Sequence, residues 1–186
     1  MNKIVIAITG ASGSVYAKLL LEKLFSIRNQ FSDVAVVITE NAKKIWQMEI
    51  SDSSYKDFSF TYYRNNDFTA PFASGSAQYN IMLVVPCSMG MIGRIANGIS
   101  NDLISRAADV ILKERRKLIC VPREAPYSIV HIENMKKITE AGGIICPASP
   151  SFYHHPSDIE ALTATVINRV LDLADLKISS NRWGDN

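Results

Sequence analysis

Two glycine-containing loops of the sequence combine the residue types that bind phosphate groups. The first loop, Thr9-Gly10-Ala11-Ser12-Gly13, follows the apolar run Ile4–Ile8, and the second, Pro86-Cys87-Ser88-Met89-Gly90, follows Ile81–Val85. Glycine permits tight turns and close approach of the backbone to a ligand, and the first amides of a helix attract anions. Because both loops lead into helical patterns, they predict a site for a phosphorylated ligand. The first loop lacks the spacing of the dinucleotide fingerprint, and on its own Ser12 could equally be a helix N-cap.

Two further apolar runs end in polar residues of the same kind. Thr39 follows Val34–Ile38, and Pro122-Arg123-Glu124-Ala125-Pro126 follows Leu118–Val121. The two prolines stiffen the second loop, an arginine binds phosphate, and a carboxylate moves protons. A local surface ion pair between Arg123 and Glu124 is the alternative.

Three cations in expected helices are further candidates for anion binding. Arg106 and Lys113 are seven residues apart in Asn101–Lys113, so they share a helix face and lie about 10 Å from each other. With Asp109 between them, the same pattern also fits an exposed ladder of ion pairs. Arg169 stands among apolar residues near the C-terminal end, where the ordinary interpretation is a cation at the edge of the core.

Composition and the remaining polar residues limit the classes of function. The 186 residues carry a net charge of +2, which is too small to indicate nucleic acid or an anionic membrane as a partner. The N-terminal apolar run is too short for a signal peptide, so we expect a cytoplasmic protein. Cys87, Cys120 and Cys146 form no C-x-x-C pair and are expected as reduced, buried thiols, with a catalytic thiol at Cys87 as the lesser alternative. The pair His154-His155 has no further ligand at metal spacing, so no metal is expected.

The elements that must position these residues alternate between strand and helix. Continuous apolar runs predict strands buried on both faces of a parallel sheet, at Ile4–Ile8, Val34–Ile38, Ile81–Val85, Leu118–Val121 and Gly143–Cys146. Helical patterns lie between and after them, at Ser14–Phe25, Glu40–Met48, Met89–Asn97, Asn101–Lys113, Ile129–Ala141 and Ser157–Leu173. The last helix is expected to start with a capping box of Ser157 and Glu160.

This order predicts a single α/β domain with a doubly wound, mostly parallel sheet in three layers, Rossmann-like or flavodoxin-like. The aromatic and polar stretch 51–76 is expected as an ordered excursion with a short strand and a loop. Residues 1–178 form the expected domain, and residues 179–186 a tail that packs on the site or on a neighbouring subunit. In such a sheet, ligands bind beyond the carboxyl ends of the strands.

Taken in order, several blocks of the sequence resemble the flavin prenyltransferases, the UbiX family. The blocks are Ile8-Thr9-Gly10-Ala11-Ser12-Gly13, Pro71-Phe72-Ala73-Ser74-Gly75-Ser76, Pro86-Cys87-Ser88, Arg106-Ala107-Ala108-Asp109-Val110, Leu112-Lys113-Glu114-Arg115-Arg116, Val121-Pro122-Arg123-Glu124-Ala125-Pro126, His131-Ile132-Glu133-Asn134-Met135 and Phe152-Tyr153-His154. The resemblance runs from Lys3 to about Trp183.

The resemblance implies an enzyme that joins the dimethylallyl group of dimethylallyl phosphate to N5 and C6 of reduced FMN. The product, prenylated FMN, would serve a UbiD-type decarboxylase. It also implies no metal, a homododecamer, and active sites built from several subunits. The residues implied to hold FMN are Gly10, Ala11, Ser12, Thr39, Ser88, Met89, Gly90, Met91 and Arg123. Those implied to meet the donor are Arg106, Lys113, Glu124, Tyr153, Arg169 and Trp183.

The resemblance makes Glu49 a catalytic carboxylate and places Glu124 at the donor. Our hypothesis is that Glu49, with Ser12, takes the proton lost on ring closure and that Glu124 manages the phosphate proton, with the swapped roles as the alternative. Met89 and Met91 depart from the family pattern, since many relatives carry Thr in the second place after Ser88. The alternatives are a flavin-dependent decarboxylase of peptidyl cysteines and an FMN carrier on the same scaffold.

Overall fold

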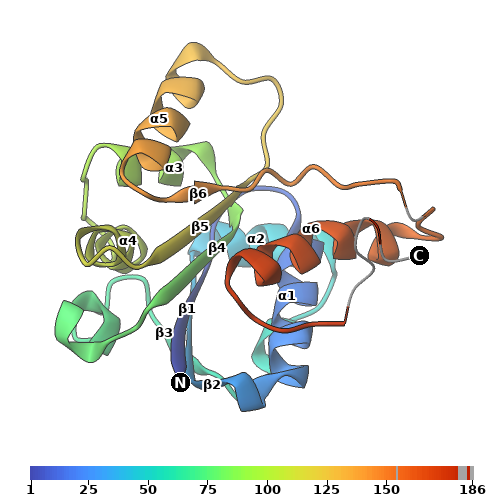
Figure 1. Cartoon of the computed structure of the whole chain (residues 1–186), viewed down its shortest axis with the longest axis horizontal. Helices are drawn as coiled ribbons and strands as arrows, with labels where there is room; N and C mark the ends of the chain where they lie inside the picture. Colours follow the sequence, from blue (N-terminus) through green and yellow to red (C-terminus); the bar gives the residue numbers. More distant parts are fainter. Residues whose placement is uncertain (154, 180–183, 185–186) are drawn as a thin grey trace.

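A parallel sheet runs through the middle of the protein (Figure 1). The computed structural model describes residues 1–153, 155–179 and 184. In them, the strands lie in the order β3-β2-β1-β4-β5-β6, and every neighbouring pair is parallel. Their bounds are β1 (Asn2–Ile8), β2 (Phe31–Ile38), β3 (Thr61–Tyr63), β4 (Ile81–Cys87), β5 (Lys117–Pro122) and β6 (Ile144–Ile145). All five expected apolar runs contribute to the sheet, as predicted.

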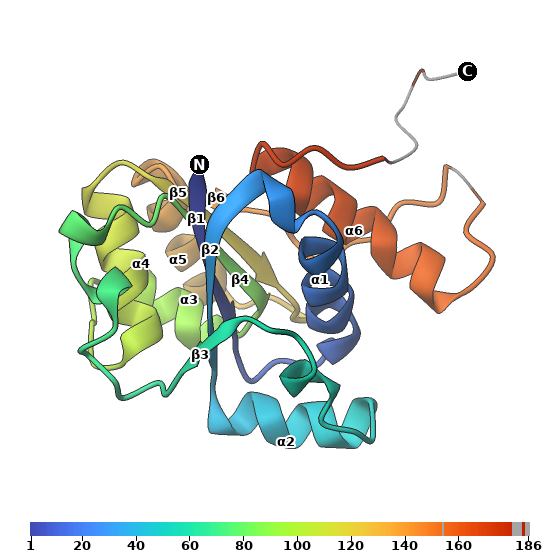
Figure 2. The same cartoon turned by 90° about the horizontal axis from the view of Figure 1, so that it is seen from below.

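Helices cover both faces of the sheet. Figure 2 shows one layer formed by α1 (Ser14–Ser26), α2 (Glu40–Glu49) and α6 (Ile159–Leu173), and the opposite layer formed by α3 (Met89–Ala96), α4 (Leu103–Lys113) and α5 (Ile129–Glu140). Successive strand residues point to opposite faces, which divides the core in two. In β1, Ile4, Ile6 and Ile8 pack with the α1 layer, and Val5 and Ala7 pack with the α3 layer. The three-layer prediction is confirmed.

The aromatic excursion between α2 and β4 is ordered, as expected. It contains the edge strand β3 and short 3-10 turns. Phe72 is buried between the rings of Tyr63 and Tyr79, with ring centres 5.1 and 5.5 Å away. Trp46 of α2 is fully buried and donates its indole N–H to Asp52 at 3.0 Å. These contacts join the start of the segment to α2 and pack its later part around Phe72.

The predicted start of the last helix is wrong by one residue. Asp158 is the N-cap of α6, and its carboxylate accepts from the Ala161 amide at 2.7 Å. Ser157 instead donates its hydroxyl to Asp158 at 2.9 Å. A carboxylate accepts more strongly than a hydroxyl at a helix start, where the dipole also favours negative charge.

The expected tail lies mostly outside the described residues, and Trp183 and Arg182 are among those not described. The prediction of a packed tail from residue 179 onward therefore stays a prediction. Within the described part of the chain, no helix has the length and apolar character needed to cross a membrane.

Candidate active site

A cavity of about 370 Å³ opens at the carboxyl ends of the central strands. β1 and β4 are neighbours there, but α1 and α3, which follow them, lie on opposite faces. The loops after the two strands diverge, and this is the switch point where open α/β sheets bind ligands. The residues lining the cavity are Gly10, Ala11, Ser12, Ile45, Met48, Glu49, Ser88, Met89, Arg123 and Glu124.

Thr9 joins the two loops that form the floor of this cavity. Its side chain is buried and donates to the Pro86 carbonyl at 2.9 Å. The Thr9 hydroxyl oxygen also accepts from the Ser88 amide at 2.8 Å. Since β1 and β4 are paired strands, this bridge holds both loops at a fixed separation.

Two hydroxyl residues cap helices beside the cavity and keep a proton to donate. Ser88 accepts from the Met91 amide at 3.3 Å, and Thr39 accepts from the Ala42 amide at 3.1 Å. Each hydroxyl uses one lone pair as a cap, so its O–H is left for a ligand oxygen. Ser88 lines the cavity, whereas Thr39 does not.

The remaining residues of the α3 turn differ in what they can offer. Met89 lines the cavity, and a side chain added at Gly90 would meet nothing within 4 Å. The side chain of Met91 is fully buried in the core, so only its backbone faces the turn. Beyond Ser88 and Met89, the helix start therefore presents amides and open space rather than side chains.

Glu49, the last residue of α2, sits on the N-terminus of α1. Its carboxylate accepts from the Gly13 amide at 3.1 and 3.0 Å and from the Ser14 amide at 2.7 Å. Partial burial acts to raise the pKa of Glu49, but hydrogen bonds from the Ser12 side chain and the two amides outweigh it, and the pKa is lowered. Glu49 is therefore held as a carboxylate.

Ser12 is not the N-cap of α1, so the helix-cap hypothesis for this residue is wrong. The cap position is Gly13, with φ of 115° and no side-chain cap. That left-handed backbone is strained for residues with a side chain, which explains the glycine. Ser12 is exposed in the cavity and hydrogen-bonded to Glu49 instead.

Arg123 and Glu124 close the cavity from the β5 side. The Arg123 Nε donates to the Ser12 carbonyl at 3.1 Å, which joins the loop after β5 to the loop after β1. Burial raises the pKa of Tyr16 in α1, and the charge of Arg123 opposes that rise. Glu124 accepts from the amide of Ala125 at 3.1 Å. The surface-pair alternative is wrong, because no ion pair joins Arg123 to Glu124 among the described residues.

The other four described donor-binding candidates do not line this cavity. Arg106 pairs with Asp109 at 2.8 Å on α4, as in the ladder hypothesis, but Lys113 pairs with Glu114 at 2.6 Å rather than with Asp109. Tyr153 is exposed before α6. Arg169 is exposed on α6 and close enough to Cys146 to oppose the rise that burial causes in the pKa of that thiol. Trp183 lies outside the described residues.

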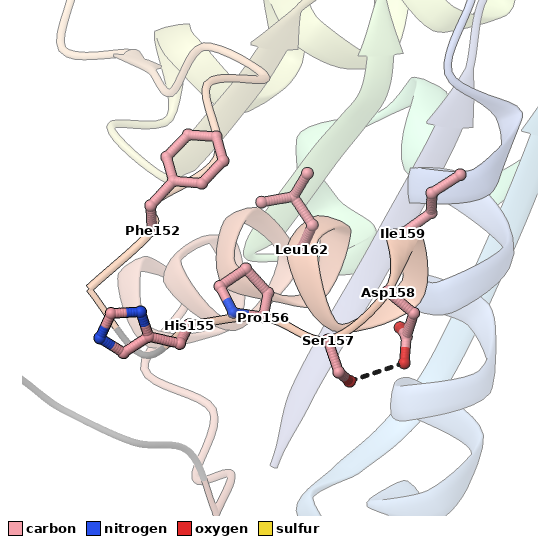
Figure 3. A pocket seen from close by; sticks show the side chains of 7 residues that line it. All are labelled: Phe152, His155, Pro156, Ser157, Asp158, Ile159 and Leu162. Atoms are coloured by element: carbon pink, nitrogen blue, oxygen red, sulfur yellow. Dashed lines mark hydrogen bonds between the residues drawn. The ribbon is translucent and has the colours of Figure 1, made fainter.

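A second hollow, of about 500 Å³, lies at the start of α6 (Figure 3). Its lining comes from the segment before the helix and from the first turns of the helix, namely Phe152, His155, Pro156, Ser157, Asp158, Ile159 and Leu162. Its described lining contains no lysine or arginine, and the Asp158 carboxylate already occupies the helix start as the N-cap. The chemistry therefore belongs to the smaller cavity at the switch point.

The cavity suits a flavin nucleotide. Helix-start amides, hydroxyl donors and Arg123 offer partners for a phosphate, while Ile45, Met48 and Met89 supply apolar surface for a ring system. Gly10 allows the first loop to lie against α2, because a Cβ there would be 2.9 Å from the Cβ of Asn41. Among the described residues, no group of three or more His, Cys, Asp or Glu side chains could hold a metal ion.

Comparison with known proteins identifies the family of this chain. The family model described as Flavoprotein matches residues 1–179. The chain is 44% identical over 185 residues to the flavin prenyltransferase UbiX of Methanocaldococcus jannaschii, with 98% of each chain covered. It belongs to the UbiX family of flavin prenyltransferases.

Two solved structures of UbiX-like proteins share the fold closely. A dodecameric FMN-dependent UbiX-like decarboxylase from Escherichia coli O157:H7 is 35% identical, with a TM-score of 0.90 and 97% of both chains covered. AnUbiX (PadA1), solved in complex with FMN and dimethylallyl pyrophosphate, is also 35% identical, with a TM-score of 0.86 and coverage of 97% of this chain and 98% of that one. The alternatives of a peptidyl-cysteine decarboxylase and an FMN carrier are not favoured by the similarity to flavin prenyltransferases and to the complex with FMN and dimethylallyl pyrophosphate.

Three residues of this UbiX-family site were not singled out by the sequence. Ile45 and Met48 line the cavity beside Glu49, and their spacing on one helix face is the only signal that could have indicated them. Thr9 was seen only as part of a motif. Its bridging role depends on strand pairing, which residue types alone do not reveal.

Proposed function

We propose that this protein transfers the dimethylallyl group of dimethylallyl phosphate to reduced FMN, forming bonds at N5 and C6 as phosphate leaves. The product would be prenylated FMN for a UbiD-type decarboxylase, and the reaction would take place in the cytoplasm. The observation that carries the proposal is the Glu49 carboxylate, which accepts hydrogen bonds from the Gly13 and Ser14 amides at the wall of a cavity suited to flavin, in a chain of the UbiX family.

Reduced flavin supplies the nucleophilic atoms when it is bound, and the residues of this chain supply binding and proton transfer. The starts of α2 and α3, with Thr39, Ser88 and Arg123, would hold the FMN phosphate and the flavin edge. Glu49 would accept the proton that ring closure releases, because a carboxylate with a lowered pKa is deprotonated at neutral pH. Glu124 lies across the cavity and would exchange a proton with the leaving phosphate.

The donor phosphate needs cations, and among the described residues of one chain Arg123 is the only lysine or arginine that lines the cavity. We propose that Arg106 and Lys113 of one neighbouring subunit, and Tyr153 and Arg169 of another, complete the site. The dodecameric structure of the Escherichia coli relative supports an assembly that brings such surfaces together. Cations around the leaving group stabilise the charge that develops on the phosphate.

Anaerobic incubation of the purified protein with reduced FMN and dimethylallyl phosphate tests the proposal. We expect mass spectrometry of the released flavin to show the addition of one five-carbon unit. Unmodified FMN recovered from a protein that binds it would overturn the prenyltransferase function and favour a carrier. Running dimethylallyl pyrophosphate in parallel identifies which donor is used.

A further inference from the structure

Lys113 is held in place by the residue that follows it. Its Nζ donates to Glu114 Oε1 at 2.6 Å, and the other carboxylate oxygen lies 3.7 Å from Arg116. Arg116 is largely buried, with 17% of its side chain exposed. A carboxylate shared by two cations has fewer accessible rotamers than one in a single exposed pair, so Lys113 is fixed as well.

The loop between β3 and β4 forms the other side of this arrangement. Arg116 donates to the Gly75 carbonyl at 2.7 Å and to the Tyr79 carbonyl at 3.0 Å. Arg106 is attached to the same loop, because its Nε donates to the Ala73 carbonyl at 3.1 Å. The same loop therefore contacts Arg106 directly and Lys113 indirectly, through Arg116 and Glu114.

Gly75 leaves room for the Glu114 carboxylate. A Cβ at this position would lie 2.3 Å from Oε1 and 2.7 Å from Cδ of Glu114. Any side chain at position 75 would push the carboxylate away from its present place. Because the displaced atoms are the far end of a flexible side chain, the fold itself would tolerate the change.

We infer that Glu114 is a positioning residue, which orients the Lys113 ammonium toward the phosphate of the prenyl donor. The inference rests on the proposed function, which assigns Lys113 to that phosphate. An ammonium has three donors, so one can be used by Glu114 while the other two remain for phosphate oxygens. Lys113 is the last residue of α4, where the helix dipole also favours a cation.

Two variants disturb the carboxylate in different ways. Glu114→Gln keeps the shape and removes the charge, and Gly75→Ala keeps the charge and displaces it. We expect each to raise the KM for the prenyl donor and the inhibition constant of inorganic phosphate about tenfold, with a smaller change in kcat. Because both act through one contact, the double variant should lose no more than the stronger single variant.

Matched controls are Glu140→Gln on α5, where the carboxylate pairs with Lys136 at 4.0 Å, and Gly93→Ala, where a Cβ finds its nearest neighbour at 3.5 Å. Both should leave KM and phosphate inhibition unchanged. FMN affinity and thermal stability should stay constant in all the variants, which a merely structural role of Glu114 would not allow.

Unchanged donor KM and phosphate inhibition in Glu114→Gln would overturn the inference. A weaker interaction with the donor that is accompanied by a matching fall in thermal stability or FMN affinity would overturn it as well. If the wild-type protein does not prenylate FMN, the proposed function fails. A titration of the protein–FMN complex with inorganic phosphate, followed by ³¹P NMR, then decides separately whether Glu114 orients an anion-binding Lys113. Weaker phosphate binding in both variants would support that role, and equal binding would end it.

Discussion

At the scale of single residues, Glu49 stays charged because of where helix α1 begins. Two backbone amides at the start of that helix and the Ser12 hydroxyl all donate to the carboxylate. Donors that stabilise the charged form lower a pKa. The first turn of α1 is therefore used to hold an internal carboxylate, which leaves the starts of α2 and α3 for the anion of a ligand.

Replacing Glu49 with glutamine should remove the base while keeping a side chain of similar size. We expect formation of prenylated flavin to fall by at least about 100-fold, the lower range for loss of a general base. FMN affinity, measured by fluorescence titration, should change only a few-fold. Retention of full activity in Glu49→Gln would show that another group accepts the proton.

The lowered pKa of Glu49 has a consequence for pH dependence. An ordinary glutamate titrates near pH about 4.3, and Glu49 titrates lower because its charged form is hydrogen-bonded. Its contribution to stability is then complete above the unfolded value and lost as pH falls through the folded value. We expect the acid limb of kcat/KM to lie below about pH 4.3, with circular dichroism run in parallel to exclude unfolding. An acid limb well above that value would contradict a Glu49 base.

At the scale of elements, the site is set by how helices begin. The starts of α1, α2 and α3 surround or adjoin the cavity, and each has a different N-cap residue: Gly13, Thr39 and Ser88. The left-handed glycine turns the chain sharply, and the two hydroxyl residues satisfy amides with their own oxygens. Loop chemistry of this kind, rather than the helices themselves, decides which amides face a ligand.

Because Asp158 and not Ser157 is the N-cap of α6, the two residues should differ in their effect on stability. Asp158→Ala should lower the free energy of unfolding by about 1 kcal/mol, the usual cost of losing an N-cap. Ser157→Ala should cost only a few tenths, because Ser157 contacts the cap and not the helix amides. Urea unfolding of the two variants side by side checks the assignment. A larger loss in Ser157→Ala would restore Ser157 as the cap.

Thr9 offers a test of the bridge between the two loops. Thr9→Val keeps the shape but leaves the Ser88 amide without its acceptor, which should cost about 1–3 kcal/mol. Because the bridge also sets the width of the cavity floor, FMN affinity should fall together with stability. Thr163→Val, at a buried threonine of α6 that donates to the Ile159 carbonyl away from the cavity, is a suitable comparison, and an unchanged FMN affinity in Thr9→Val would contradict the bridging role.

At the scale of the whole molecule, one chain carries two separate halves of the proposed site. The flavin cavity opens at the switch point, whereas Arg106 and Lys113 belong to α4 and its neighbouring loop, away from the cavity lining. We propose that an assembly which places the α4 surface of one chain at the cavity of another would bring these two sets of residues together.

Mixing two inactive variants tests the shared site. Glu49→Gln damages the cavity half, and Lys113→Ala damages the α4 half. If subunits exchange or are co-expressed, some sites receive both intact halves, and we expect prenylation to reappear. Co-expression of Glu49→Gln with Ser12→Ala, both in the same half, should restore nothing. Absence of recovery in the first mixture, with mixed oligomers verified by mass spectrometry, would show that each site is built from one chain.

The sequence indicated the scaffold better than the site. Runs such as Ile4–Ile8 and Ile81–Val85 are apolar without interruption because both faces of their strands are buried, so the pattern and the fold have the same cause. Ser12 was ambiguous because its role depends on the φ angle of the next residue. The cap of α6 was assigned to the wrong neighbour because Ser157 and Asp158 are both good caps. The Glu114–Gly75 contact joins residues far apart in the chain, and no local pattern encodes it.

The Thr9 bridge also limits local opening of the two loops that form the cavity floor. Loops that hold ligands usually belong to the parts of a structure that open most easily, but here the loops after β1 and β4 are fastened to each other through a buried hydroxyl. Their amides are therefore part of the same cooperative unit as the central strands. In hydrogen exchange, the Ser88 amide should be replaced by deuterium as slowly as those of β4, and heating should release bound flavin only when the sheet itself comes apart.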